Sequence, residues 1–270
     1  MGLIKAILRR VRLLSIASRV YHSLLRIKYY VRYYTLAWSD SKARNVPIPP
    51  SHLITLVAGN PDSGWFLLSG RLAAESLLNS LSKNKIVADA PISVLDFGCG
   101  CGRVLRNLGS LKRARLYGTD YNQELINWCN KNLTFAEFMT NHLEPPLACC
   151  DQKFDLIYGF SVFTHLPESL QLTWINELAR VLKPHGYLLI STHGAHYLNL
   201  LTTQEQAQFR EGQLVVREEQ AAGTNICNVY HPDRFVRDRL AKGFFVVDWI
   251  TEGAKGNPFQ DIYLLRKLPN

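Results

Sequence analysis

The sequence predicts an α/β fold: a doubly wound, mostly parallel seven-stranded sheet that ends in an antiparallel hairpin, preceded by an N-terminal helical extension. Short apolar runs alternate with helix-length segments between residues 93 and 192, which is the spacing of βαβ units with right-handed crossovers. The last two apolar runs, 244–250 and 260–266, lie too close together for a crossover and predict an antiparallel pair. A chain of 270 residues that is 47% hydrophobic can bury the core of one such domain.

The N-terminal extension differs in charge from the rest of the chain. Residues 1–44 contain ten Lys and Arg residues and one acidic residue, whereas the remaining 226 residues contain 21 of each sign. The net charge of +9 therefore belongs to the extension, and the neutral body predicts no basic face for nucleic acid. We expect a basic helical extension at 1–45 and one domain at 46–270, which comprises a helical lid at 46–89 and a core at 90–267.

Residues 3–14 of the extension show an amphipathic basic pattern with the period of a helix. Three interpretations stay open for residues 1–34: a helix on an anionic membrane surface, an organellar transit peptide, and a helix that packs on its own domain or on a second subunit. Charged residues interrupt every apolar run before it reaches the roughly 18 to 20 residues of a membrane-spanning helix. We expect a cytoplasmic protein, with peripheral membrane contact as the open alternative.

Composition disfavours two further classes of site. The six cysteines form no CxxC pair and no Cys/His set at zinc spacing, so we expect a reduced chain without metal. The Tyr- and Arg-rich residues 29–34 could stack nucleic-acid bases, but such clusters are more often helix faces or interface belts. We therefore expect no nucleic-acid partner, and nothing in the pattern determines an oligomeric state.

Local patterns predict the elements of the first half of the domain. The Pro-rich residues 46–50 cannot be helical and separate the extension from the domain. Strands are predicted at apolar β-rich runs, and helices where the apolar period lengthens. In chain order the elements are helices across 51–82 with a loop at 60–64, strand 93–97, glycine turn 98–102, helix 103–110, strand 115–120 and helix 122–132.

The second half completes the alternation and then changes rhythm. A Lys-Pro-His-Gly turn at 183–186 leads into the last strand of the alternating region, and after residue 194 the predicted elements become short. In chain order they are strands 135–139 and 154–160, helix 167–182, strand 187–192, helix 204–210, strands 214–217 and 226–230, helix 232–242, and the two terminal strands.

The chemistry is predicted by a glycine-rich turn. Residues 94–102 are Val-Leu-Asp-Phe-Gly-Cys-Gly-Cys-Gly, and the turn follows one strand and precedes a helix. Gly98, Gly100 and Gly102 let the backbone approach a ligand without Cβ clashes. Asp120 lies 18 residues after the last glycine, at the end of the next strand, where a carboxylate can accept two hydrogen bonds from a ribose diol.

Asp96 distinguishes between the cofactors that such a turn can bind. A carboxylate at the mouth of the turn is a poor neighbour for a pyrophosphate but suits a cationic amino group. S-adenosylmethionine carries a ribose and an ammonium group, whereas NAD lacks the ammonium group. Here the sequence resembles the class I S-adenosylmethionine-dependent methyltransferases, whose motif D/E-x-G-x-G-x-G corresponds to residues 96–102. The resemblance spans about residues 90–267 and includes Asp120, residues 154–158 and 182–187, and the terminal hairpin.

The resemblance implies a Rossmann-like fold, S-adenosylmethionine as the cofactor, and a role for each matching position. Asp96 and the glycine turn would face the methionine part, Asp120 would bind the ribose hydroxyls, and Tyr121 would flank the adenine. Many relatives place an acidic residue after the third strand to bind the adenine amino group. This chain has Asn141 in that region, and Asn141 is our candidate for the contact through its amide.

Histidines near the carboxyl edge of the sheet are the candidate catalytic bases. His165 follows the fourth strand and His193 follows the fifth, at the edge where open α/β folds bind ligands; His231 is a third, weaker candidate. The alternative for His165 is a structural histidine that hydrogen-bonds the backbone. Trp65, together with Phe66 and Arg71 in the helix predicted over the cofactor mouth, is assigned to the substrate side by position alone.

The resulting hypothesis is a methyltransferase that acts on a small-molecule or glycan acceptor, with oxygen favoured because a histidine base is available. Two alternatives stay open: a non-catalytic or regulatory protein that keeps the fold, and an NAD-dependent oxidoreductase, which Asp96 and the terminal antiparallel pair disfavour. The acceptor pocket is expected from residues 46–82 and 194–232, and neither segment carries a motif for one acceptor chemistry.

Overall fold

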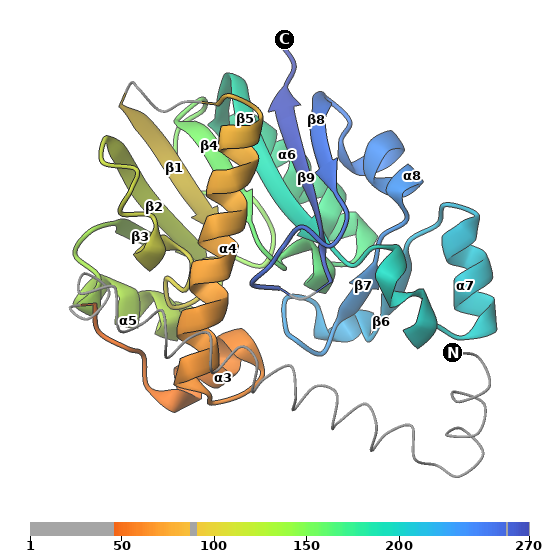
Figure 1. The fold of residues 1–270 in the computed structure, drawn as a ribbon, viewed down its shortest axis with the longest axis horizontal. Helices are drawn as coiled ribbons and strands as arrows, with labels where there is room; N and C mark the ends of the chain where they lie inside the picture. The colour runs from red at the N-terminus through yellow and green to blue at the C-terminus, as the bar shows by residue number, and fades with distance from the viewer. Residues whose placement is uncertain (1–45, 87–90, 258, 270) are drawn as a thin grey trace. The chain divides into compact units, whose positions relative to one another are not determined.

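The computed structural model describes residues 46–86, 91–257 and 259–269. Within these residues the main sheet has seven strands in the order β3-β2-β1-β4-β5-β9-β8 (Figure 1). β1 to β5 are parallel, and β9 lies antiparallel between β5 and β8. The strands are β1 Ile92–Phe97, β2 Ala114–Asp120, β3 Glu137–Thr140, β4 Phe154–Gly159, β5 Leu182–Thr192, β8 Phe244–Ile250 and β9 Asp261–Lys267. The predicted doubly wound sheet with a terminal antiparallel pair is confirmed.

Helices cover both faces of this sheet. Helix α4, Ser63–Lys83, crosses one face, and helix α6, Glu168–Val181, lies behind the other (Figure 1). Alternate residues of each strand point to opposite faces, so Val94 packs with the α4 residues whereas Leu95 packs with those of α6. Both faces are therefore buried, which is why the inner strands are nearly continuous apolar runs.

Two further helices lie near the carboxyl ends of the strands. Helix α3, Ser51–Ala58, and helix α5, Gln123–Asn132, share a small apolar cluster with the glycine turn. The side chain of Asn122 caps α5 by accepting hydrogen bonds from the backbone N–H groups of Glu124 and Leu125, which would otherwise have no partner in the helix. This cap fixes the start of α5 at Gln123, three residues after Asp120, the last residue of β2.

A segment inserted after β5 builds a second, two-stranded antiparallel sheet. Its elements are η4 Ala195–Leu200, α7 Thr203–Arg210, β6 Val215–Arg217, η5 Glu219–Ala221, β7 Asn228–Tyr230, α8 Asp233–Phe235 and the π-helix η6 Val236–Leu240. Residues 218–227, which join β6 to β7, are called the strap below. The small sheet and helix α7 lie at the same end of the main sheet as α3 (Figure 1).

The structure differs from the predicted elements in several places, among them the strand predicted at 226–230, which is β7 Asn228–Tyr230. Residues 103–110 form only a short 3₁₀ helix, η2 Leu105–Asn107, because the N–H groups of Asn107 and Leu108 donate to carbonyls three residues back in the chain. The third strand starts two residues late, at Glu137. Residues 183–186 bulge out of β5 and do not end it. The helix after Pro232 is wound as a π-helix over most of its length.

The predicted amphipathic helix at 3–14 and the aromatic, basic cluster at 29–34 both lie outside the described residues. Within the described part of the chain, no helix is both long enough and apolar enough to cross a bilayer.

Candidate functional site

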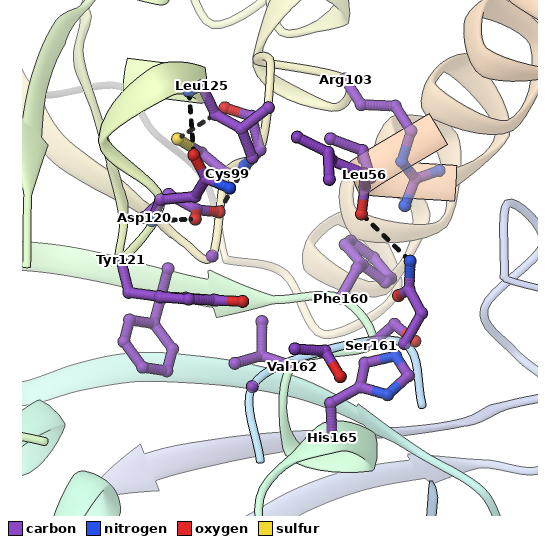
Figure 2. Close-up of a pocket in the computed structure, with 18 of the residues that line it drawn as sticks. Leu56, Cys99, Arg103, Asp120, Tyr121, Leu125, Phe160, Ser161, Val162 and His165 are labelled. Carbon is purple, nitrogen blue, oxygen red and sulfur yellow. Dashed lines mark hydrogen bonds between the residues drawn. The ribbon is translucent and has the colours of Figure 1, made fainter. Parts of the chain in front are cut away.

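A cavity of about 530 Å³ opens at the carboxyl ends of β1, β2 and β4 (Figure 2). Its floor is the sheet edge and the glycine turn, and residues of α3 and the strap line its other side. The sheet order reverses between β1 and β4, and the crevice at such a reversal is where open α/β sheets bind ligands. The volume is that of a pocket for a whole small molecule.

The glycine turn brings backbone N–H groups and a carboxylate together at the cavity floor. Gly98 and Gly100 have φ angles of 73° and 54°, which strain any residue with a side chain. The Gly100 N–H donates to Asp120 Oδ2 at 2.9 Å and so joins the turn to the end of β2. Gly102 has a different position: it is absent from the cavity lining, and a Cβ there would lie 2.6 Å from Leu133 Cδ1. Gly102 thus allows close packing of the turn.

Asp120 is held in the cavity wall by two backbone donors. Besides the bond from Gly100, its Oδ1 accepts a hydrogen bond from the Asn122 N–H at 2.9 Å. Burial raises the pKa of Asp120, and the hydrogen bonds from Asn122 and Gly100 partly offset this rise. Each carboxylate oxygen keeps further acceptor capacity, so the oriented side chain can accept bonds from a pair of ribose hydroxyls.

Asp96 lines the same cavity and has an unpaired oxygen. Its side chain is 3% exposed, and its Oδ2 has no hydrogen-bond partner among the described residues. Burial raises the pKa of Asp96 to about 7, against the lowering effect of the nearby Tyr158 hydroxyl and Arg103 guanidinium. A buried carboxylate oxygen without a donor is costly, and the ammonium group of a bound ligand would satisfy it.

The predicted adenine residues lie at the other end of the cavity. Tyr121 and Asn141 both line it, and Figure 2 shows Tyr121 beside Asp120. The Asn141 side chain already has internal partners: Oδ1 accepts from the Thr119 hydroxyl at 2.6 Å, and Nδ2 donates to the His142 carbonyl at 2.6 Å. One Oδ1 lone pair and one Nδ2 hydrogen are left for a ligand, so the oriented amide can still accept a hydrogen bond from an adenine amino group.

The structure separates the three candidate histidines. His165 lines the cavity, and its Nδ1–H donates to the Cys227 carbonyl at 2.7 Å, which leaves Nε2 as the unprotonated nitrogen. Burial lowers the pKa of His165, so the ring is neutral at pH 7. A neutral ring with a free Nε2 lone pair can accept a proton from a group bound in the cavity.

The other two histidines are buried behind the cavity and do not line it. The His193 Nδ1–H donates to the Val229 carbonyl at 3.1 Å, and His231 lies against the Gln171 amide. Burial lowers the pKa of both histidines to about 3. His193 thus does not face the cavity, and its backbone pairs with Tyr230 of β7.

The strap and α3 close one side of the cavity through a few specific contacts. Asn225 Nδ2 donates to the Leu56 carbonyl at 3.0 Å, which satisfies an acceptor in the last turn of α3 (Figure 2). The Gly223 N–H donates to the His165 carbonyl at 2.8 Å. A Cβ on Gly223 would lie 2.7 Å from a methyl group of Leu143, so the strap also packs tightly over the adenine end.

The sequence-based assignment missed part of this site and misplaced another part. Arg103, directly after the glycine turn, lines the cavity, as do strap residues 223–226, which no sequence motif marks. Trp65 lines the cavity as expected. Phe66, in contrast, is fully buried in the cluster beneath α3, and Arg71 pairs with Glu75 on the surface of α4.

Comparisons with known proteins agree with this geometry. The model of the methyltransferase-domain family matches residues 68–247. The mitochondrial ubiquinone biosynthesis O-methyltransferase of Dictyostelium discoideum is 23% identical over 57% of this chain and 48% of its own length. The malonyl-[acyl-carrier protein] O-methyltransferase of Buchnera aphidicola is 32% identical over 52% of this chain and 53% of its own length. The chain thus spans about half the length of these curated relatives.

A solved S-adenosylmethionine-dependent methyltransferase from Methanosarcina mazei has the same fold. It superposes with a TM-score of 0.50 at 21% identity, over 66% of this chain and 93% of that one. The family match covers about two thirds of the chain and includes the glycine turn, Asp120 and His165. The chain belongs to the class I S-adenosylmethionine-dependent methyltransferase family, and its cofactor is S-adenosylmethionine.

Proposed function

We propose that this protein transfers the methyl group of S-adenosylmethionine to an oxygen atom of a small-molecule or glycan acceptor, with His165 as the base. The observation that carries the proposal is the joint lining of one cavity by Asp96, Asp120 and the neutral His165. The cofactor supplies an activated methyl group on a sulfonium leaving group. The chain therefore has to bind and orient two molecules and remove one proton.

The residues of the cavity fit this cofactor. The unpaired Oδ2 of Asp96 accepts from the methionyl ammonium group, and Asp120 accepts from the ribose hydroxyls. Gly98 and Gly100 allow the close approach of the ligand to the turn, while Tyr121 and Asn141 flank the adenine. This assignment extends the cofactor from the glycine turn to the loop after β3 and leaves the space near His165 for the acceptor.

His165 is suited to remove a hydroxyl proton. Its Nδ1–H donates to the Cys227 carbonyl, so the proton would be accepted by Nε2. The protonated ring would keep its hydrogen bond to that carbonyl, which stabilises the positive charge. A hydroxyl is a weak nucleophile at pH 7 and needs such a base. The names of the two relatives above, a ubiquinone biosynthesis O-methyltransferase and a malonyl-[acyl-carrier protein] O-methyltransferase, support oxygen as the methylated atom.

The test is an acceptor screen with methyl-labelled S-adenosylmethionine. Pools of phenols, sugars, hydroxy acids and acyl compounds are incubated with the wild-type protein and with Asp120→Ala as the cofactor-site control. We expect label on a hydroxyl oxygen of one class of compound with the wild type and none with the control, because a carboxylate is already ionised at pH 7 and would need no base. Label found only on nitrogen or carbon would contradict the assignment of oxygen, and failure to bind S-adenosylhomocysteine would contradict the whole proposal.

A further inference from the structure

A buried arginine in the cavity wall has an unused donor. Arg103 is 7% exposed, and its Nη2 donates to Asn257 Oδ1 at 3.0 Å. Its Nη1 is buried and has no hydrogen-bond partner among the described residues. The guanidinium carbon lies 6.0 Å from the centre of the Trp65 ring. Burial lowers the pKa of Arg103 only to about 10, so the group remains charged at pH 7.

Neighbouring residues do not explain this free donor. Asp96 is near enough to affect the pKa of Arg103, yet no hydrogen bond or ion pair joins these two described side chains. Arg103 and Asp96 are thus two opposite buried charges, each with one unpaired atom. Arg106 also has a buried nitrogen without a partner among the described residues, but only Arg103 lines the cavity. An unpaired donor on a buried charge is costly, and its place in the cavity wall points to a partner that arrives with a ligand.

We propose that Arg103 binds a carboxylate of a ligand in this cavity, with Asn257 and Trp65 holding the guanidinium in place. Of the described residues that line the cavity, Arg103 is the only lysine or arginine. One guanidinium beside two aspartates matches a singly charged anion better than a phosphate group, whose second charge would face Asp96 and Asp120. The inference rests on the proposed function, because it assigns a further group of the same pocket.

Two molecules can bring a carboxylate to this place. The amino-acid end of the cofactor carries an ammonium and a carboxylate on one carbon, and these would satisfy Asp96 and Arg103 together. An acceptor with a carboxylate is the other source, since Arg103 lies away from Asp120 and Tyr121 in the pocket (Figure 2). The chemistry is the same in both cases, so the experiment has one arm for each source.

The first arm compares two ligands by isothermal titration calorimetry. S-adenosylhomocysteine is compared with its decarboxylated analogue, aminopropylthio-adenosine, which keeps the adenosine, the sulfur and the amino group. Each is titrated into the wild type, Arg103→Gln and Arg106→Gln. Arg106 is the matched control: it follows three residues later and lies over the Phe66 ring, but it donates to the Pro47 carbonyl and does not line the cavity.

If the carboxylate is that of the cofactor, the wild type and Arg106→Gln bind S-adenosylhomocysteine roughly 10- to 100-fold more tightly than the analogue, as expected for a charge-assisted bond. Arg103→Gln binds both ligands with the affinity of the analogue. Because Arg103 is buried, melting curves accompany each titration, and Arg103→Lys provides a variant that keeps the charge. Arg103→Lys retains part of the difference between the ligands.

The second arm tests an acceptor carboxylate. Benzoate and the neutral benzamide are titrated into protein saturated with S-adenosylhomocysteine. An acceptor site predicts benzoate binding in the wild type and Arg106→Gln that is lost in Arg103→Gln, with equal wild-type affinity for the two adenosine ligands. If Arg103→Gln changes neither the affinities for the adenosine ligands nor that for benzoate, while the wild type binds S-adenosylhomocysteine, the inference is overturned and the proposed function is not. If the wild type does not bind S-adenosylhomocysteine, the proposed function is overturned with it.

Discussion

The two sides of the cavity are built in different ways. On the cofactor side, Asp96 and Asp120 belong to adjacent strands of the central sheet, where the β1–β2 ladder fixes their spacing. On the acceptor side, α3, the strap and His165 come from distant parts of the chain and are joined by a few hydrogen bonds. Leu56 and Ile226 on this side are 47% and 63% exposed. The cofactor side is therefore held by the core of the fold, whereas the acceptor side depends on local contacts that can change without unfolding the sheet.

Replacing His165, the proposed base, should have the largest effect and should separate the two sides most clearly. With an acceptor from the screen, His165→Gln is expected to lower the transfer rate roughly 10²- to 10⁴-fold, the usual loss for a positioned base. Affinity for S-adenosylhomocysteine should stay within about twofold. The control is His142→Gln, because His142 also lines the cavity but lies at the adenine end. Equal rates for both variants would show that His165 does not take the proton.

Removal of the ribose carboxylate should affect the cofactor side alone. Asp120→Ala is expected to weaken S-adenosylhomocysteine by about 3 kcal/mol, or roughly 100-fold, because charge-assisted bonds to two hydroxyls are lost. Calorimetric titration measures the change. Asp155→Ala is the matched control: Asp155 is the second residue of β4, at the opposite edge of the sheet, and pairs with Lys183, so its loss should lower the melting temperature without changing affinity. Unchanged affinity in Asp120→Ala would place the ribose elsewhere.

The charge of Asp96 predicts a pH dependence for the cofactor side. The folded-state pKa of about 7 lies above the ordinary value, so Asp96 is increasingly neutral as the pH falls below 7 and no longer attracts an ammonium group. Affinity for S-adenosylhomocysteine should fall by up to roughly tenfold per pH unit below 7 and level off above it. In Asp96→Asn the slope between pH 7 and pH 6 should disappear. A steep slope that persists in this variant would assign the titration to another group.

Loosening the strap should produce the smallest change. Asn225→Ala removes one exposed hydrogen bond to α3, worth about 0.5 to 1.5 kcal/mol. We expect faster hydrogen exchange at the Gly223 amide, read by mass spectrometry of strap peptides, with cofactor affinity changed by less than about fivefold. Asn228→Ala is the control, because Asn228 makes a similar bond to the Ile226 carbonyl that does not reach α3. Identical exchange in the two variants would show that Asn225 does not hold the strap closed.

The sequence alone predicts that Asp96, the glycine turn and Asp120 lie together, because these residues are close together in the chain. Asp96 and the glycine turn form one continuous segment, and Asp120 follows one helix and one strand later. Parallel strands in a βαβ unit end at the same edge, so this short spacing already places the carboxylates together. The alternation of strands and helices and the terminal antiparallel pair also depend on residues that are close together in the chain.

The acceptor side was decided by tertiary structure. His165 and His193 both follow strands at the same edge and cannot be distinguished by pattern, but β7 pairs beside His193 and buries it, whereas His165 faces the cavity. The carbonyl that holds the His165 proton comes from Cys227, 62 residues later. Arg103 directly follows the glycine turn in the sequence, but only the structure shows that its Nη1 is buried without a partner among the described residues. Burial and hydrogen bonding are properties of segments packed from all parts of the chain, and only the folded structure determines which donors and acceptors remain free for a ligand.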